Sequence, residues 1–272
     1  YFFKNADGDE ALYIHKGSGT LESIFGTLRY GPGDYLVIPR GTIYRLSEDE
    51  PGTRILVVES ASPIEVPKRY RNEYGQLLED APYRERDIRV PESLDMIEKS
   101  GRHEVRILAR GKMHAYYYDF HPFDLIGWDG YVYPYAFNIN LFQPIPGQIH
   151  LPPPIHQTFE AKGYVICSFV PRMLDYHPDA VPAPHNHSNI DSDEMIYYAN
   201  DRFASRRGIE EGSVTLHPAG IPHGPQPGAT EASLGKTETT ELAVMVDTFH
   251  PLKITKVALK MEDPGYPFSW QT

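Results

Sequence analysis

This chain contains the stretch Gly212-Ser-Val-Thr-Leu-His-Pro-Ala-Gly-Ile-Pro-His223 and repeats its spacing near the start as Gly33-Asp-Tyr-Leu-Val-Ile-Pro-Arg-Gly-Thr-Ile-Tyr44. In both stretches a glycine precedes a short run of strand-forming residues, and Pro-x-Gly ends the run. The glycine after the proline can take the positive φ of a tight turn. Each stretch therefore predicts a strand that ends in a turn, and the repetition predicts two related barrels.

The second copy carries residues that are typical of a metal site. It ends at His223, and upstream lie Glu194, His187 and, two residues before that, His185. Two histidines and one carboxylate form the facial triad typical of non-haem Fe(II), which leaves positions open for substrate and O2. We predict that His187, Glu194 and His223 bind a metal ion. Spacing alone leaves zinc and manganese open, and a hydrogen-bonded structural role is the alternative for a lone histidine.

The first copy lacks the histidines. Glu10 corresponds to Glu194, but Phe3 and Tyr44 stand where the second copy has His187 and His223. Phenyl and phenol rings fill a core well and are poor ligands for a divalent ion. We therefore predict that the first copy keeps the scaffold and has lost the metal.

Composition limits the class of protein. The chain has 272 residues, 40% of them hydrophobic, and a formal net charge of -11, which argues against binding to nucleic acid or to an anionic membrane surface. No apolar stretch approaches the ~20 residues of a membrane span, and no signal peptide is evident. The single cysteine, Cys167, lies in an apolar run and is expected to be a buried thiol, which fits a cytoplasmic protein.

The fold class follows from 25 prolines and 22 glycines, which leave little room for long helices. Short apolar runs between them read as strands, at residues 12–14, 35–38, 54–58, 105–108, 164–170, 195–198, 213–216 and 241–246. One short helix is expected within residues 91–101. We predict a mainly all-β chain, a sandwich or jelly-roll barrel with few short helices.

The repeat also suggests how the chain divides into domains. We expect an N-terminal barrel part at 1–62, a connector with the short helix at 63–110, and a metal-binding C-terminal barrel with a tail at 111–272. The tail alternates Tyr266, Phe268 and Trp270, which indicates a docked terminal segment.

The two motifs resemble those of the cupin superfamily, in which His-x-His and a glutamate are followed by Gly, five residues, Pro-x-Gly, two residues and His. The second motif matches throughout. The first is longer, because six residues separate His187 from Glu194, and Asp201 replaces a glycine. The resemblance implies a double-stranded β-helix, here a bicupin.

Longer stretches resemble homogentisate 1,2-dioxygenase and its shorter bacterial homologues: Pro122-Phe-Asp-Leu-Ile-Gly-Trp-Asp-Gly130, Tyr131-Val-Tyr-Pro-Tyr-Ala-Phe-Asn138, His187-Ser-Asn189 and Ile221-Pro-His-Gly-Pro225. That family holds one Fe(II) with His, Glu and His, and cleaves the ring of a hydroquinone-type acid with O2. The resemblance implies these roles for the predicted triad, homogentisate or a relative as substrate, a place in aromatic catabolism such as tyrosine degradation, and a homo-oligomer.

Ring cleavage needs a base for the phenolic proton, and the sequence offers His217, His185 and Asp129. His217 stands six residues before His223, with a structural strand-end role as its alternative. His185 replaces a tyrosine of the family pattern and has a fourth-ligand role as its alternative. Asp129 replaces a family histidine, and capping a turn is its alternative.

Three further residues are candidates for binding the substrate: Arg172 for its carboxylate, His156 at the mouth of the cavity, and Tyr135 for its ring, although tyrosines of this kind more often pack in cores. Two other functions stay open. One is a different metal-dependent cupin reaction, such as isomerisation or another oxygenation, and the other is a bicupin that binds a metal or small molecule without turnover.

Overall fold

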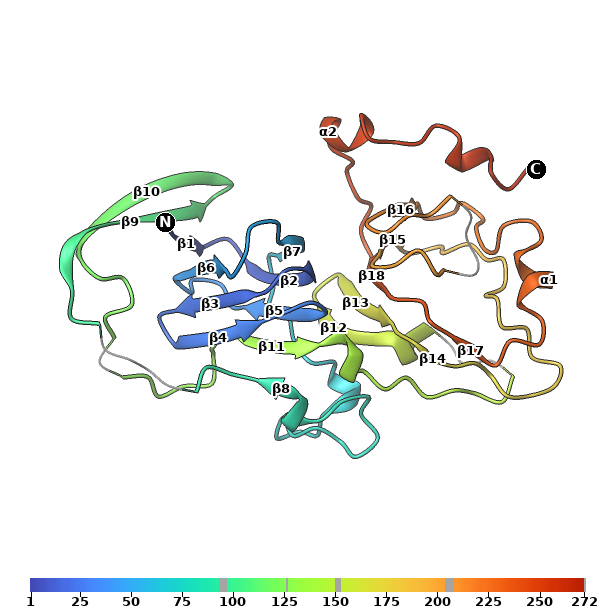
Figure 1. Ribbon diagram of the computed structural model, residues 1–272, viewed down its shortest axis with the longest axis horizontal. Coiled ribbons are helices and arrows are strands. Elements are labelled where there is room, and N and C mark those ends of the chain that lie inside the picture. Colours follow the sequence, from blue (N-terminus) through green and yellow to red (C-terminus); the bar gives the residue numbers. More distant parts are fainter. Residues whose placement is uncertain (93–96, 126, 150–152, 204–207, 272) are drawn as a thin grey trace. The chain divides into compact units, whose positions relative to one another are not determined.

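A computed structural model describes residues 1–92, 97–125, 127–149, 153–203 and 208–271. The chain forms two compact units, Tyr1–Leu141 and Phe142–Thr272 (Figure 1). Both consist mainly of β-strands, so the all-β class with few short helices is confirmed. None of the helices in the described part of the chain is long and apolar enough to cross a membrane.

The first unit contains two sheets. Its strands are β1 (Phe2–Asn5), β2 (Asp9–Lys16), β3 (Gly19–Ser23), β4 (Gly26–Tyr30), β5 (Asp34–Ile38), β6 (Tyr44–Glu48), β7 (Arg54–Ser60), β8 (Ile88–Arg89), β9 (Ser100–Ala109), β10 (Lys112–Phe120) and β11 (Tyr135–Asn138). Short 3₁₀ turns lie at Lys68–Tyr70, Glu85–Asp87 and Ile139–Leu141. One sheet has the order β10-β9-β1-β6-β3-β4 and the other β7-β2-β5-β11-β8.

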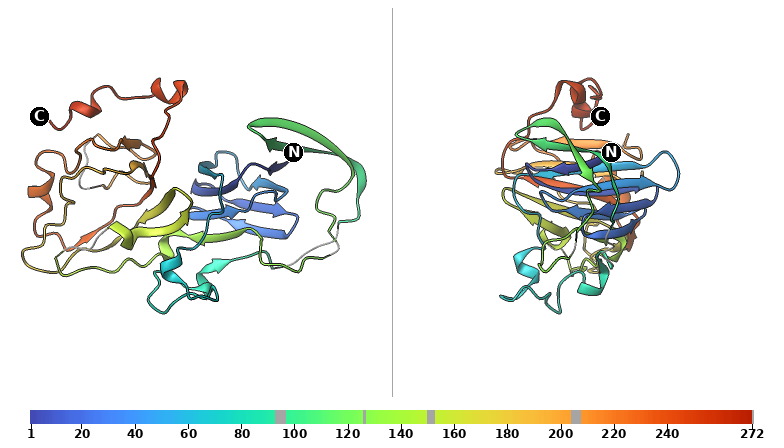
Figure 2. Two further views of the ribbon diagram at one scale, coloured as in Figure 1. Left: turned by 180° about the vertical axis from the view of Figure 1, so that it is seen from behind. Right: turned by 90° about the vertical axis from the view of Figure 1, so that its left-hand side faces the viewer.

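The core of this unit lies between its two sheets. Leu12 and Leu36 of one sheet pack in the same buried cluster as Leu21 and Leu28 of the other. β5 is buried along its whole length, as its apolar run predicts. At the edge of the first sheet, β9 and β10 form a curved two-stranded ribbon (Figure 2).

The second unit is built around one five-stranded sheet. Its elements are β12 (Gln157–Ala161), β13 (Tyr164–Phe169), β14 (Arg172–Met173), β15 (Asp193–Tyr198), β16 (Val214–His217), α1 (Ala229–Ser233), β17 (Glu238–Thr239), β18 (Ala243–Thr248) and α2 (Lys256–Leu259), with 3₁₀ turns at Pro153–His156 and Tyr266–Phe268. The main sheet has the order β12-β13-β18-β15-β16, and β14 pairs with β17. Cys167 is buried in its core.

Alternation along β15 directs Glu194 inward. Ile196 and Tyr198 belong to the buried core of this unit, and side chains two residues apart on a strand share a face. Glu194 therefore lies on the core face at the end of the same strand. Across the sheet it is paired with His217 of β16 and with Asp247 of β18.

The observed division differs from the expected one in two respects. The boundary between units follows Leu141 rather than residue 110, because β9 pairs with β1 and β11 pairs with β5, which ties residues up to 138 to the first unit. The helix expected within 91–101 falls partly on residues 93–96, outside the described residues, and Ser100 and Gly101 belong to β9.

Candidate metal centre

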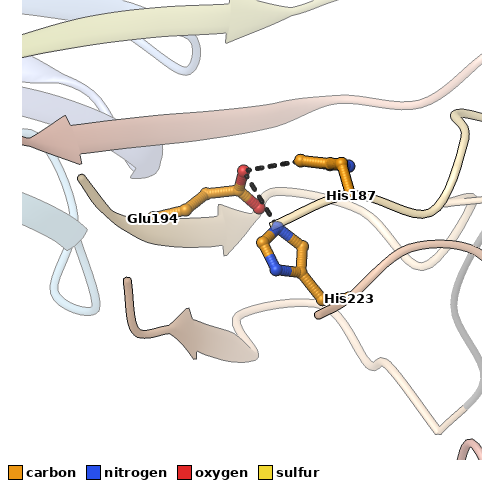
Figure 3. Close-up of side chains that lie close together, drawn as sticks. All are labelled: His187, Glu194 and His223. Carbon is orange, nitrogen blue, oxygen red and sulfur yellow. Dashed lines mark ion pairs between the residues drawn. The ribbon is translucent and has the colours of Figure 1, made fainter. Parts of the chain in front are cut away.

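The predicted ligands of the second copy come together at one point. His187, Glu194 and His223 each offer a ligand atom, and these atoms lie within 4.8 Å of one another. Glu194 Oε2 lies 3.6 Å from His223 Nε2 and 4.0 Å from His187 Nε2 (Figure 3). His223 and Glu194 are buried, whereas a third of the His187 side chain is exposed, so the cluster opens to solvent on the His187 side.

The backbone sets the two histidines opposite one another. His187 and His223 form an isolated antiparallel bridge, in which the N–H of each donates to the carbonyl of the other at 2.8 Å. Their rings approach to 4.4 Å between centroids. Gly224 allows this approach, because a Cβ there would lie 2.7 Å from the Cα of Asn186.

Both imidazoles are oriented by the carbonyl two residues earlier. His187 Nδ1 lies 3.0 Å from the carbonyl oxygen of His185, and His223 Nδ1 lies 2.9 Å from that of Ile221. A carbonyl can only accept, so Nδ1 carries the proton in each ring and Nε2 keeps its lone pair. This is the second-sphere arrangement that fixes the tautomer of metal-binding histidines.

A buried aspartate that the sequence analysis missed anchors the ligand loops. Asp193 Oδ1 accepts from Ala219 N at 2.8 Å and Oδ2 accepts from Leu252 N at 2.7 Å. It thereby ties the strand of Glu194 to the Pro-x-Gly turn before His223. The signal was present in the sequence, since the pair Asp-Glu occurs in both copies, as Asp9-Glu10 and Asp193-Glu194.

Glu194 has one oxygen committed to the protein. His217 Nδ1 lies 2.9 Å from Oε1, whereas Oε2 is the oxygen that faces the two ligand histidines. Burial acts to raise the pKa of Glu194, but the contacts with His217 and His223 outweigh it and hold that pKa below its usual range. The carboxyl is therefore held in the ionised form that a metal ligand requires.

A second carboxyl, also missed from the sequence, faces Glu194 from β18. Burial, reinforced by the charge of Glu194, raises the pKa of Asp247 to about 7. Within the described residues its buried Oδ1 has no hydrogen-bond partner. The centre thus contains a cross-strand row of Asp247, Glu194 and His217.

The three candidate bases lie in different surroundings. His217 is buried, with Nδ1 at Glu194 and Nε2 3.1 Å from the hydroxyl of Tyr266, which suits a residue that positions Glu194. The His185 side chain is exposed and lies outside the cluster of ligand atoms. Asp129 is exposed and belongs to the first unit. A base role for any of them stays a prediction.

The candidate substrate residues are not part of the triad. Tyr135 lies on β11 of the first unit, where it pairs with Val37. In the second unit, the ring of His156 lies 4.6 Å from that of Phe169, and burial lowers the pKa of His156 to about 3. Arg172 Nη1 lies 2.7 Å from Glu241 Oε1, so its guanidinium already has a carboxylate partner.

The donor set fits a divalent metal ion. Two imidazole Nε2 atoms of fixed tautomer and one carboxylate oxygen converge, and each ligand is held by a second group of the protein. Three protein ligands leave coordination positions for other molecules, as in catalytic rather than structural metal sites.

Comparisons with known proteins place the chain in a family. A protein of Saccharolobus solfataricus named "Putative dioxygenase" is 46% identical over 273 residues, which cover 100% of this chain and 70% of the relative. Homogentisate 1,2-dioxygenases of Rhodopseudomonas palustris and Bradyrhizobium diazoefficiens are each 28% identical, and the matches cover 98% and 93% of this chain. The chain spans 62% and 58% of the length of those two relatives.

Similar solved structures include a cupin 2 conserved barrel domain protein from Leptotrichia buccalis, with a TM-score of 0.36 and 12% identity over 92% of this chain and 77% of the other. A mutant of Bacillus subtilis oxalate decarboxylase gives a TM-score of 0.39 and 13% identity over 93% and 67%.

The family model described as homogentisate 1,2-dioxygenase N-terminal matches residues 1–139. This match covers half of the chain, and the 46% identical relative covers all of it. The chain belongs to the homogentisate 1,2-dioxygenase family.

Proposed function

We propose that this protein is a metal-dependent dioxygenase that uses O2 to cleave the ring of a hydroxylated aromatic acid, homogentisate or a related hydroquinone. The observation that supports it is the convergence of His187, Glu194 and His223 in a chain of this family. Fe(II) is the proposed ion, because two histidines and one carboxylate with open positions are typical of non-haem iron oxygenases. The reaction belongs to aromatic catabolism, including tyrosine degradation.

When bound, Fe(II) would supply an electrophilic centre that accepts a phenolate oxygen and O2 and carries electrons between them. The chain's own residues prepare that site. The bridge between His187 and His223 fixes their Nε2 atoms, and His217 occupies Glu194 Oε1 so that Oε2 remains for the ion. Burial of Glu194 and His223 excludes water from one side, which leaves the partly exposed His187 side for entry of substrate.

The identity of the aromatic acid is the open part of the proposal. Asp129 and His185 stand where the family pattern has histidine and tyrosine, so the groups near a ring hydroxyl differ. Arg172 is paired with Glu241, so a substrate carboxylate would have to displace that partner. A panel of hydroquinone acids is therefore a better test than homogentisate alone.

The test is to load the full chain with Fe(II) under anaerobic conditions and to follow O2 consumption with homogentisate, gentisate and related hydroquinones. We expect O2 uptake with at least one of them, and none after His223→Ala. Tyr44→Phe, at the matching place of the first copy, is the control and should retain activity. Metal uptake without O2 consumption on any substrate would contradict ring cleavage and favour another metal-dependent reaction, such as isomerisation.

A further inference from the structure

The C-terminal segment, defined as residues 266–270, returns to the metal centre from the end of the chain. The residues that connect it to β18, 249–265, are all exposed. Tyr266, Ser269 and Trp270 are partly buried, and each makes a polar contact with the ligand region. The end of the chain is therefore partly buried only in the segment that reaches the metal centre, and not in the residues that lead to it.

These contacts fall on residues beside the ligands. The hydroxyl of Tyr266 lies 3.1 Å from His217 Nε2, and Trp270 Nε1 donates to the carbonyl of Gly224 at 3.2 Å. Gln226 Nε2 donates to Ser269 Oγ at 2.6 Å. Gly224 directly follows the ligand His223, so the segment holds both the ligand turn and the residue that supports Glu194.

Tyr266 completes a chain of polar contacts that ends on Oε1 of the ligand Glu194. His217 Nδ1 lies 2.9 Å from Glu194 Oε1, and a carboxylate oxygen accepts, so the N–H of Nδ1 donates to it. His217 Nε2, on the opposite edge of the ring, lies 3.1 Å from the hydroxyl of Tyr266. The hydroxyl therefore fixes the edge of the imidazole that faces away from Glu194 and keeps Nδ1 directed at Oε1.

Ring packing fixes the plane of His217 as well. His217 stacks on His223 with centroids 4.4 Å apart and an interplanar angle of 11°. The ring of Tyr266 lies 6.3 Å from that of His217 at an interplanar angle of 25°, and Trp270 packs edge-on against Tyr266 at 5.3 Å. His217 thus contacts both a ligand and the C-terminal segment, which limits rotation of its ring.

We propose that Tyr266 is a positioning residue of the metal centre: its hydroxyl holds His217 in the orientation that occupies Glu194 Oε1 and reserves Oε2 for the metal ion. The inference rests on the proposed function only in that the triad binds a metal. The first copy has no such device, since Ile38 stands where the second copy has His217.

The test compares metal affinity across variants of the full chain, measured with Co(II) against a competing chelator, together with the visible absorption of bound Co(II). Tyr266→Phe removes the hydroxyl and keeps the ring. We expect Co(II) to bind about three- to tenfold more weakly, which corresponds to the loss of one hydrogen bond. We also expect the absorption band of bound Co(II) to change. Tyr176→Phe removes the same atom from an exposed tyrosine of the same unit and should change neither.

Two further variants separate positioning from simple docking. In a His217→Gln background, Tyr266→Phe should have no additional effect, because the hydroxyl acts through the imidazole. Trp270→Phe removes the indole bond to Gly224 but keeps Tyr266 and His217, and should weaken binding less than about twofold.

Three results would overturn the inference. The losses of Co(II) affinity could be additive in the double variant, Trp270→Phe could lose as much affinity as Tyr266→Phe, or Tyr266→Phe could keep the wild-type affinity. A wild-type chain that takes up no Co(II) would overturn the proposed function as well. A chain that binds Co(II) equally with and without the hydroxyl would leave the proposed function standing.

Discussion

The two copies share a backbone frame and differ in the side chains that it presents. Asp9 accepts from Arg40 N and Ile64 N, just as Asp193 accepts from Ala219 N and Leu252 N. The N–H of the turn glycine donates at 2.7 Å to the carbonyl of an asparagine in both, Gly41 to Asn5 and Gly220 to Asn189. Phe3 pairs with Tyr44 as His187 pairs with His223.

What differs is the treatment of one buried glutamate. In the first copy, burial raises the pKa of Glu10 to about 7, and the hydroxyl of Tyr44 donates to it at 3.0 Å. In the second, imidazoles surround Glu194 and its pKa is depressed. The first copy therefore keeps the frame without histidines, and the change from aromatic to imidazole side chains is what makes a ligand set.

The largest effect is expected from removing a ligand. His223→Ala takes away one of three donors whose backbone is fixed by the bridge to His187, so we expect metal affinity to fall well over 100-fold, beyond the loss for a supporting residue. Fold should persist, because Tyr44 shows that the frame does not need a histidine here. Metal content after Fe(II) or Co(II) loading measures the loss of binding, and circular dichroism checks that the variant is folded.

The matched change in the first copy is Tyr44→Phe, which should leave metal content at the wild-type value. Equal metal content in His223→Ala and wild type would show that the ligand assignment is wrong. Metal loss in Tyr44→Phe would show that the first copy is not the structural barrel that its sequence predicts.

Much of this comparison could be predicted from sequence, because the frame depends on residues that are easy to read. Glycine and proline fix the turns, and His187, Glu194 and His223 stand at the spacing that brings them together. The partners of Glu194 were harder to predict. The pairing of β15 with β16 and β18 brings His217 and Asp247 beside it, and these lie 23 and 53 positions further along the chain. The alternating aromatic tail predicted a docked segment, but not that Tyr266 reaches His217.

The domain boundary was missed for a related reason. The run at 105–108 was read correctly as a strand, but β9 pairs with β1 in parallel, which no local pattern indicates. Likewise β11 completes a sheet with β5, about a hundred residues earlier in the chain. The distribution of long-range strand pairs, rather than the local sequence of the connector, decides where the first unit ends.

An intermediate effect concerns pH and Glu10 of the first copy. The folded-state pKa of Glu10 is about 7 against an ordinary value of 4.5, so folding favours the protonated carboxyl. Its contribution is complete below about pH 4.5 and is lost as pH rises through about 7, a change of about 3 kcal/mol in the free energy of unfolding. Glu10→Gln should remove this part of the pH dependence, leaving the part that comes from Asp247, whose pKa is also raised to about 7, and should be more stable than wild type at pH 8.

Urea unfolding of the full chain at pH 5 and pH 8 measures this difference, with the exposed Glu50→Gln as the control that leaves both values unchanged. A Glu10→Gln chain that parallels wild type at both pH values would show that Tyr44 satisfies the ionised carboxyl in full.

The smallest effect is expected from rebuilding a site in the first copy. Phe3→His with Tyr44→His places two imidazoles on a paired backbone beside Glu10, so we expect a second Co(II) ion per chain at high metal concentration. That site should bind at least about tenfold more weakly than the native one, because Ile38 gives Glu10 no imidazole in the place where His217 supports Glu194. Adding Ile38→His should recover part of the difference. If the triple variant still bound a single ion, the shared frame would not be enough to converge three donors, and the second copy would owe its ligand geometry to the contacts that the first copy lacks, those of the C-terminal segment above all.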